Sequence, residues 1–177
     1  TFLGNMASPN TCWLLLRSLE TLKVRMEQQA KNAQAIAAFL VDHPMVDKLH
    51  YLGCLEPSSK EYKIYKKQYS SPGAMIAFEI KGKEKEAFRF LNELRLIKLA
   101  VSLGSTESLV QHPASMTHIG LSPDLKAKIG ITEGLIRLSV GVEHHEDLIA
   151  DISYALDQAT TILPAANELS PLSPALC

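Results

Sequence analysis

The sequence is poor in cysteine and aromatic residues, has no long apolar run and carries no excess of charge of either sign. Its 177 residues include three widely spaced cysteines and no Cys-x-x-Cys pair, which argues against a disulfide scaffold or zinc ribbon and favours a reducing, cytoplasmic location. Eighteen Lys and Arg against nineteen Asp and Glu give a net charge of −1, so no nucleic-acid partner is expected. The longest apolar stretch, Ala35–Val41, is far shorter than the roughly 18 residues of a membrane span, so no membrane partner is expected either.

Motifs for several common chemistries are also absent. Of the six histidines, His144 and His145 are adjacent, while His112 and His118 have no Asp, Glu or Cys at the usual ligand intervals, so no metal site is predicted. We interpret His144 and His145 as solvated residues at the start of a helix. No Gly-rich phosphate loop and no Gly-x-Ser-x-Gly motif occurs, so phosphoryl and acyl transfer have no support.

The first third of the chain has the pattern of one long amphipathic helix. Ser8-Pro9 is typical of a helix start, and Asp42-His43-Pro44 is typical of a helix end. Apolar residues recur between them at helical spacing, from Trp13 to Leu40. A helix of about 30 residues exceeds what a small domain needs for its own core, so part of its apolar stripe is expected to pack against a neighbour outside this chain.

Beyond the helix, short strands and helices alternate. Strands are predicted at 46–52, 73–80, 97–103, 108–111 and 135–140, a short helix or loop at 59–69, and helices at 83–94, 122–130 and 146–159. The order favours the α+β class, with an antiparallel or mixed sheet of about four strands and helices on one face. We therefore divide the chain into a long helix (1–42), a compact domain (43–162) and a flexible tail (163–177).

One charged residue interrupts the last predicted strand. Arg137 lies in the run Leu135–Val140, on the same face as Leu135 and Ser139 by period-two alternation. A guanidinium in such a strand requires a partner, which is either a carboxylate of the same protein or the anionic group of a ligand. The turn Val101–Thr106, rich in small residues, is a second candidate anion site, although most such turns have no ligand.

Several ordered motifs together resemble one enzyme family. They include Leu99–Gly104, Glu107-Ser108-Leu109, His112–His118, Gly130-Ile131 and Arg137–Glu143, and the helix from Ser8 to Met26 adds to them. The chain up to about Ala159 resembles the carboxy-terminal part of the pyridoxal-phosphate-dependent enzymes of cysteine and methionine metabolism.

This resemblance implies the smaller domain of an aminotransferase-like fold of type I, with a mostly antiparallel sheet preceded by an interdomain helix. In the family, pyridoxal 5′-phosphate and its covalently bound lysine belong to the larger amino-terminal domain or to a neighbouring subunit. We therefore expect no catalytic and no cofactor-binding residue in this chain, and we do not assign Lys98 that role. The chain alone is expected to be inactive, and its partners are expected to be its own amino-terminal domain and a homotetramer, a dimer of dimers.

The residues that the resemblance assigns to this domain bind substrate. The arginine matching Arg137 holds the substrate α-carboxylate in a two-pronged salt bridge, with the serine matching Ser102 beside it. Val101 and Leu103 flank that serine, and Thr117 matches a residue that supports the site. Val101 stands where cystathionine-handling enzymes usually carry glutamate and methionine γ-lyases an apolar residue, so an apolar wall for a thioether is expected.

The reaction that the resemblance favours is the α,γ-elimination of L-methionine to methanethiol, 2-oxobutanoate and ammonia. Four alternatives remain open. The parent enzyme could act on cystathionine or make homocysteine from an acylated homoserine and sulfide. The chain could instead be an amino-acid-binding regulatory module, or an inactive subunit that assembles with a complete one.

Overall fold

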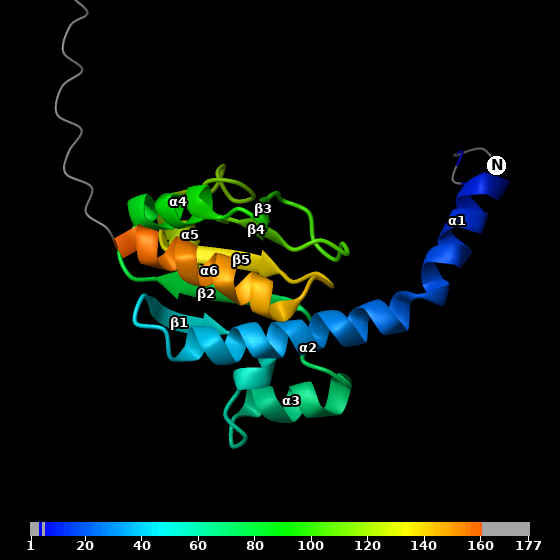
Figure 1. The fold of residues 1–177 in the computed structure, drawn as a ribbon, viewed down its shortest axis with the longest axis horizontal. Coiled ribbons are helices and arrows are strands. Elements are labelled where there is room, and N and C mark those ends of the chain that lie inside the picture. The colour runs from blue at the N-terminus through cyan, green and yellow to red at the C-terminus, as the bar shows by residue number, and fades with distance from the viewer. Residues whose placement is uncertain (1–3, 5, 161–177) are drawn as a thin grey trace, which may run out of the picture.

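The computed structural model describes Gly4 and residues 6–160 (Figure 1), so the expected flexible tail lies outside the described residues. The helices are α1 (Pro9–Glu20), α2 (Leu22–Val41), α3 (Lys60–Gln68), α4 (Glu84–Glu93), α5 (Pro123–Lys128) and α6 (His145–Thr160), with a 3-10 turn at Leu52–Cys54. The strands are β1 (Val46–His50), β2 (Met75–Ile80), β3 (Lys98–Leu99), β4 (Leu109–Gln111) and β5 (Leu135–Ser139). The predicted α+β class is confirmed.

The strands form one five-stranded sheet in the order β1-β2-β5-β4-β3. Three neighbouring pairs are antiparallel and β3 pairs with β4 in parallel, so the sheet is mostly antiparallel, as expected. The sheet has one strand more than the estimate of about four. The strand expected at 97–103 shrinks to two residues, because from Val101 onward the backbone leaves the sheet and approaches β5.

Helices α2, α4 and α6 cover one face of this sheet (Figure 1). The core between them and the sheet contains alternate residues of the two central strands. These are Ile76, Phe78 and Ile80 of β2 and Ile136 and Leu138 of β5. Leu148, Ile152 and Leu156 of α6 point into this core. In α4 the buried side is formed by Ala87, Phe90 and Leu91, whereas Phe88 is partly exposed.

The expected single long helix is wrong at one point, because it divides at Thr21 into α1 and α2. The side chain of Arg25 reaches back across the division, and its Nη2 donates to the Ser18 carbonyl at 2.8 Å. A side chain that takes a carbonyl from the helical hydrogen-bond ladder is a common cause of a helix break. The two helices meet at a bend, and α1 extends away from the domain (Figure 1).

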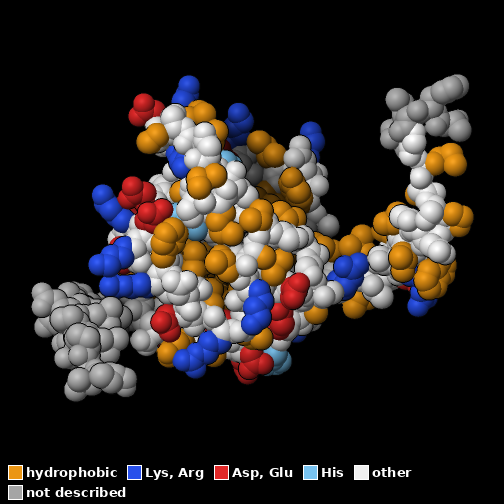
Figure 2. Space-filling model, turned by 90° about the horizontal axis from the view of Figure 1, so that it is seen from above, with side chains coloured by type: hydrophobic (Ala, Val, Ile, Leu, Met, Phe, Trp, Pro, Cys, Tyr) orange, Lys and Arg blue, Asp and Glu red, His pale blue; other side chains and the backbone are white. Residues whose placement is uncertain are grey.

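The apolar side chains of α1 are uncovered within the described residues. Trp13 is 61% exposed, and hydrophobic side chains surround this helix in the space-filling view (Figure 2). The buried part of the apolar stripe begins only at Ala30 and continues through Ala33, Ala37 and Leu40. This agrees with the expectation that the first part of the helix packs outside this chain. Among the described residues, no helix combines the length and hydropathy needed to cross a membrane.

The connection from α4 to β3 is held by one carboxylate. Asp151 of α6, only 9% exposed, accepts hydrogen bonds from the backbone N–H groups of Arg95, Leu96 and Ile97 at 2.8–3.0 Å. A backbone donor buried without a partner costs about 1–3 kcal/mol. Asp151 therefore determines where the chain enters the sheet edge that leads to residues 100–106.

We predict that Asp151→Ala lowers the free energy of unfolding by about 3 kcal/mol, because three backbone donors lose their acceptor at once. Urea unfolding followed by circular dichroism measures the change. Asp47→Ala, at an exposed position of β1, is the control and should change stability by no more than about 0.5 kcal/mol. Equal stability of the two variants would contradict this account.

Candidate functional site

Arg137 lies at the centre of the sheet, on the face opposite the helices. Its neighbours in β5, Ile136 and Leu138, are buried in the core, so alternation directs Arg137 to the other face together with Leu135 and Ser139, as predicted. Ala77 of β2 and Gln111 of β4 are its partners on the two sides. The small Ala77 leaves the face open on one side of the guanidinium.

The guanidinium is bound to backbone oxygens of the segment that follows β3. Its Nη2 donates to the carbonyl of Val101 at 2.6 Å and to that of Ser102 at 3.0 Å. Nε is buried and without a hydrogen-bond partner, and Nη1 has none among the described residues. Burial lowers the pKa of Arg137 from its ordinary value, but an arginine remains charged at neutral pH.

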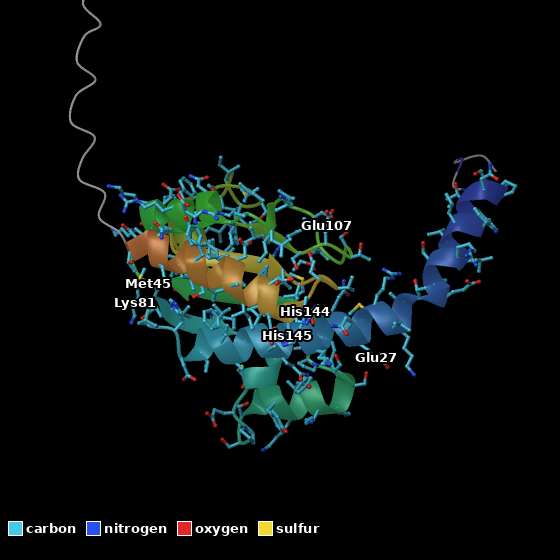
Figure 3. All side chains as sticks on the ribbon, viewed as in Figure 1. Glu27, Met45, Lys81, Glu107, His144 and His145 are labelled. Carbon is cyan, nitrogen blue, oxygen red and sulfur yellow. The ribbon has the colours of Figure 1, made fainter. Side chains whose placement is uncertain are left out.

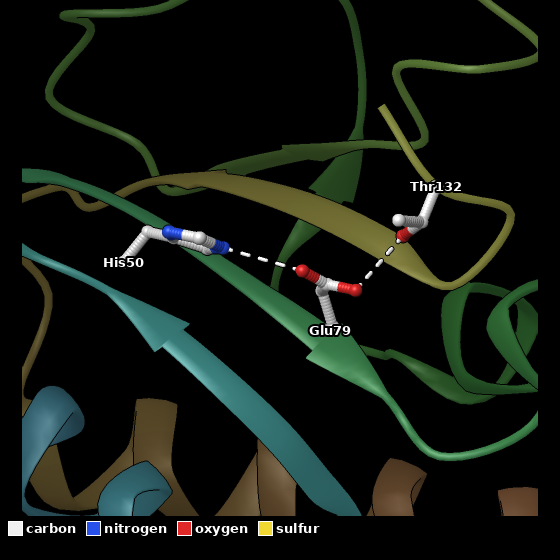
Figure 4. A network of polar contacts seen from close by, with 3 residues as sticks. All are labelled: His50, Glu79 and Thr132. Carbon is white, nitrogen blue, oxygen red and sulfur yellow. Dashed lines mark hydrogen bonds and ion pairs between the residues drawn. The ribbon is translucent and has the colours of Figure 1, made fainter. Parts of the chain in front are cut away.

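Of the two partners that the sequence left open for Arg137, a carboxylate of the same chain is not found among the described residues. Glu79 of the adjacent strand β2 is engaged elsewhere, because its carboxylate accepts from Thr132 at 3.1 Å and lies 3.3 Å from Nε2 of His50 (Figure 4). The carboxylate of Glu143 is bound by Ser108. The positive charge of Arg137 is therefore left uncompensated.

The loop that holds Arg137 is itself fixed from two directions. Gly104 has a positive φ of 78°, a conformation that glycine adopts without strain, and its N–H donates to Oγ of the buried Ser139 at 2.9 Å. On the other side, the buried Gln29 of α2 donates to the Ser105 carbonyl at 2.6 Å. The loop thus connects β5 to α2.

A second buried network extends this connection. Ser108 donates both its N–H and its hydroxyl to Glu143, and its hydroxyl accepts from Gly141 N–H at 2.9 Å. Asn32 of α2, which is fully buried, donates to the carbonyls of Gly141 at 3.1 Å and Glu143 at 2.7 Å. Helix α2 therefore holds the loops that precede β4 and follow β5.

Apolar side chains follow the same loop toward solvent. Leu99, Val101 and Leu103 alternate along the chain and are each about half exposed, at 52%, 49% and 56%. The predicted residues Val101 and Ser102 contact Arg137 through their carbonyls, and Leu103 follows them directly in the chain. This edge presents a cation beside an apolar row, which suits a ligand with a carboxylate and an apolar chain.

The fifth predicted residue, Thr117, contacts Gln111, the strand neighbour of Arg137, and makes no hydrogen bond with Arg137 itself. The Oγ1 of Thr117 accepts from Nε2 of Gln111 at 3.3 Å, and Gln111 is opposite Arg137 in the sheet. The Oγ1 of Thr117 also lies 2.9 Å from Nδ1 of His118. The five candidate residues are therefore gathered on one side of the domain.

The histidines do not form a metal site in the part of the chain that the structure describes. His144 and His145 lie where α6 begins (Figure 3), which is the position that the sequence indicated. Their rings are stacked, with centroids 5.0 Å apart. His112 is buried, and both of its ring nitrogens have hydrogen-bond partners. Nδ1 lies 2.8 Å from Ser115 Oγ, and Nε2 lies 2.8 Å from the Glu133 carbonyl oxygen.

Within the described residues, no lysine is among the hydrogen-bond or strand partners of Arg137. Lys98 lies on the edge strand β3, where its Nζ donates to the Arg95 carbonyl at 2.9 Å.

Comparison with known proteins identifies the family. Residues 1–157 match the family model described as the Cys/Met metabolism PLP-dependent enzymes. The chain belongs to this family. Among its relatives, L-methionine γ-lyase of Porphyromonas gingivalis is 49% identical over 87% of the chain, and that of Pseudomonas putida is 48% identical over 86%. Each match covers 38% of the relative, so the chain spans about two fifths of their length.

Solved structures of family members share the fold. A cystathionine γ-lyase from Micromonospora echinospora superposes with a TM-score of 0.81 at 40% identity, covering 88% of this chain and 40% of that one. A putative O-acetylhomoserine (thiol)-lyase from Campylobacter jejuni, solved with N′-pyridoxyl-lysine-5′-monophosphate, gives 0.80 at 39% identity, covering 88% and 37%. The predicted domain of a PLP-dependent fold is confirmed.

Three buried amides around Arg137 and its loop were not predicted from the sequence. Gln29 and Asn32 occur on the same side of α2 as Ala33 and Ile36, so polar residues on an otherwise buried stripe were the available signal. Gln111 is a buried amide in the three-residue strand β4. Its position beside Arg137 becomes visible only with the strand register.

We predict that Ser139→Ala loosens the loop that holds Arg137, because the N–H of Gly104 loses its acceptor. Amide hydrogen exchange at Gly104 should accelerate about tenfold, which corresponds to one lost hydrogen bond. Ser153→Ala, on α6, is the control and should leave this amide unchanged. Unchanged exchange in Ser139→Ala would show that other contacts hold the loop.

Proposed function

We propose that the intact enzyme is a lyase of sulfur-containing amino acids, with L-methionine as its substrate and methanethiol, 2-oxobutanoate and ammonia as products. The observation that carries the proposal is the uncompensated guanidinium of Arg137 beside an exposed apolar row. The names of the relatives support the same reaction, since six of them are methionine γ-lyases.

In this proposal Arg137 binds the α-carboxylate of the substrate. The loop carbonyls hold Nη2, so the remaining N–H groups of the fork are available for a planar anion. The hydroxyl of Ser102 stands beside this anion, as the family resemblance implies. Fixing the carboxylate sets which bond to Cα is perpendicular to the cofactor ring, and such positioning lowers the barrier to Cα–H cleavage.

The pyridoxal phosphate of the intact enzyme supplies an electron sink for the substrate Cα. We propose that the part of the enzyme outside this chain binds it. The uncovered apolar surface of α1 supports a large contact with that part, or with a neighbouring subunit. We also propose the cytoplasmic homotetramer that the resemblance implies.

Val101 favours methionine over cystathionine. Its apolar side chain offers no hydrogen-bond partner to the distal amino group of cystathionine, whereas it can contact a thioether. The similarity to a cystathionine γ-lyase of Dictyostelium discoideum, 46% identical, and to the thiol-lyase of C. jejuni keeps cystathionine cleavage and γ-replacement as the second candidates. Assaying the intact enzyme for methanethiol release against sulfide incorporation separates elimination from replacement.

We predict that Arg137→Ala in the intact enzyme lowers kcat/KM for methionine, because the substrate carboxylate loses its cation. The loss corresponds to about 2–5 kcal/mol of transition-state binding free energy. Steady-state kinetics measures the change. The neighbouring surface variant Lys48→Ala, on the exposed edge strand β1, serves as the control. Activity of Arg137→Ala within about threefold of wild type would refute the role in carboxylate binding.

We also predict that Val101→Glu shifts the preference toward cystathionine. The new carboxylate can pair with the distal ammonium group of cystathionine, whereas it would lose hydration against the apolar end of methionine. The ratio of kcat/KM for cystathionine to that for methionine should rise by about tenfold, which corresponds to one charged hydrogen bond. Val101→Leu keeps the apolar wall and should leave the ratio near that of wild type. A ratio that falls in Val101→Glu would remove Val101 from the specificity site.

A further inference from the structure

Two buried polar atoms have no hydrogen-bond partner among the described residues, and they are neighbours in the sheet. They are Oε1 of Gln111 and Nε of Arg137. Gln111 and Arg137 are directly opposite each other on β4 and β5, so their side chains emerge on the same face about 5 Å apart at Cβ. One atom is an acceptor and the other carries a proton to donate. A buried unsatisfied pair of this kind calls for an explanation.

The present contacts hold the guanidinium at one corner only. Both hydrogen bonds to Val101 and Ser102 come from Nη2, so the plane of the fork can turn about that corner. A second held corner would fix the plane. Nε is the corner nearest the strand, and Gln111 presents the acceptor that can reach it.

The hydrogen bonds from Gln111 to Thr117 and on to His118 leave the amide oxygen of Gln111 free to accept. Gln111 donates from Nε2 to the hydroxyl of Thr117, and that hydroxyl lies 2.9 Å from Nδ1 of His118, to which it can donate in turn. The amide of Gln111 is thereby oriented with its oxygen left over for a donor. Nε–H of Arg137 is the donor whose partner is missing.

We propose that Gln111 is a positioning residue for Arg137: its Oε1 accepts the Nε–H of Arg137 when a ligand carboxylate binds, so that Nη1 faces the carboxylate. Thr117 acts through Gln111 by orienting the amide. The inference rests on the proposed role of Arg137 in carboxylate binding. Gln111 and Thr117 therefore influence only the binding of the ligand's carboxylate, and not the binding of its other groups.

The test compares two ligands of the intact holoenzyme by calorimetric titration. L-norleucine has the α-carboxylate, and n-pentylamine is the same molecule without it. Gln111→Met should weaken norleucine binding about tenfold and leave pentylamine binding unchanged, because one charge-assisted hydrogen bond is lost. Gln34→Met, an exposed amide on α2, is the matched control and should change neither. An equal loss for both ligands would overturn the proposal.

A double-mutant cycle checks that the effect passes through Nε. Arg137→Lys keeps the charge but has no Nε–H, so adding Gln111→Met to it should weaken norleucine binding by less than about twofold, since no guanidinium remains to be held. A tenfold loss in that background would contradict the positioning role. If Arg137→Lys alone leaves norleucine binding unchanged, the role of Arg137 itself fails, which is a different result.

Thr117→Val provides a second variant at an exposed site, where folding is not at risk. It should weaken norleucine binding about threefold, by removing the weaker of the two hydrogen bonds of the amide, and should add nothing to Gln111→Met. An additive loss in the double variant would show that Thr117 acts independently of Gln111, against the proposal. Thermal unfolding of every variant confirms that the fold is intact.

Discussion

A single unpaired guanidinium governs the arrangement of this domain. Arg137 is inserted between core residues of a central strand, and its charge has no carboxylate partner within the described residues. Backbone carbonyls of Val101 and Ser102 reduce the cost of burying it but cannot neutralise it. To bring those carbonyls to β5, the chain must leave the sheet after Leu99, which is why β3 is two residues long.

Keeping that loop in place requires contacts from distant parts of the chain. Ser139 holds Gly104 from within the same strand as Arg137, whereas Gln29 and Asn32 reach from α2 to the loops before β4 and after β5. The buried amides make α2 part of the site's support as well as a connector. A displacement of α2 relative to the sheet would therefore change the position of the carbonyls that hold Arg137.

The sequence predicted the repeating features well and the single contacts poorly. Period-two alternation placed Arg137 on the correct face, because Ile136 and Leu138 had to be buried. The break at Thr21 depends on one Arg25 side chain, and the two amides of α2 depend on which loops pack against it. Such pairings join residues far apart in the chain, and a local pattern contains no information about them. Gln111 is the same case, since its relation to Arg137 exists only once β4 and β5 are in register.

In the proposed function, this unit supplies one part of a binding site. An amino acid needs its carboxylate, amino group and side chain bound at once, and the described residues provide a cation and an apolar row for two of these. The third requires groups that face Arg137 from outside the sheet, on the face opposite α2, α4 and α6. A surface brought against that open face would exclude water from the ion pair between Arg137 and the carboxylate, and the attraction between the two charges would rise as the local dielectric falls. In the proposed function, the contact between this domain and the rest of the enzyme and the binding of the substrate carboxylate by Arg137 would then occur together.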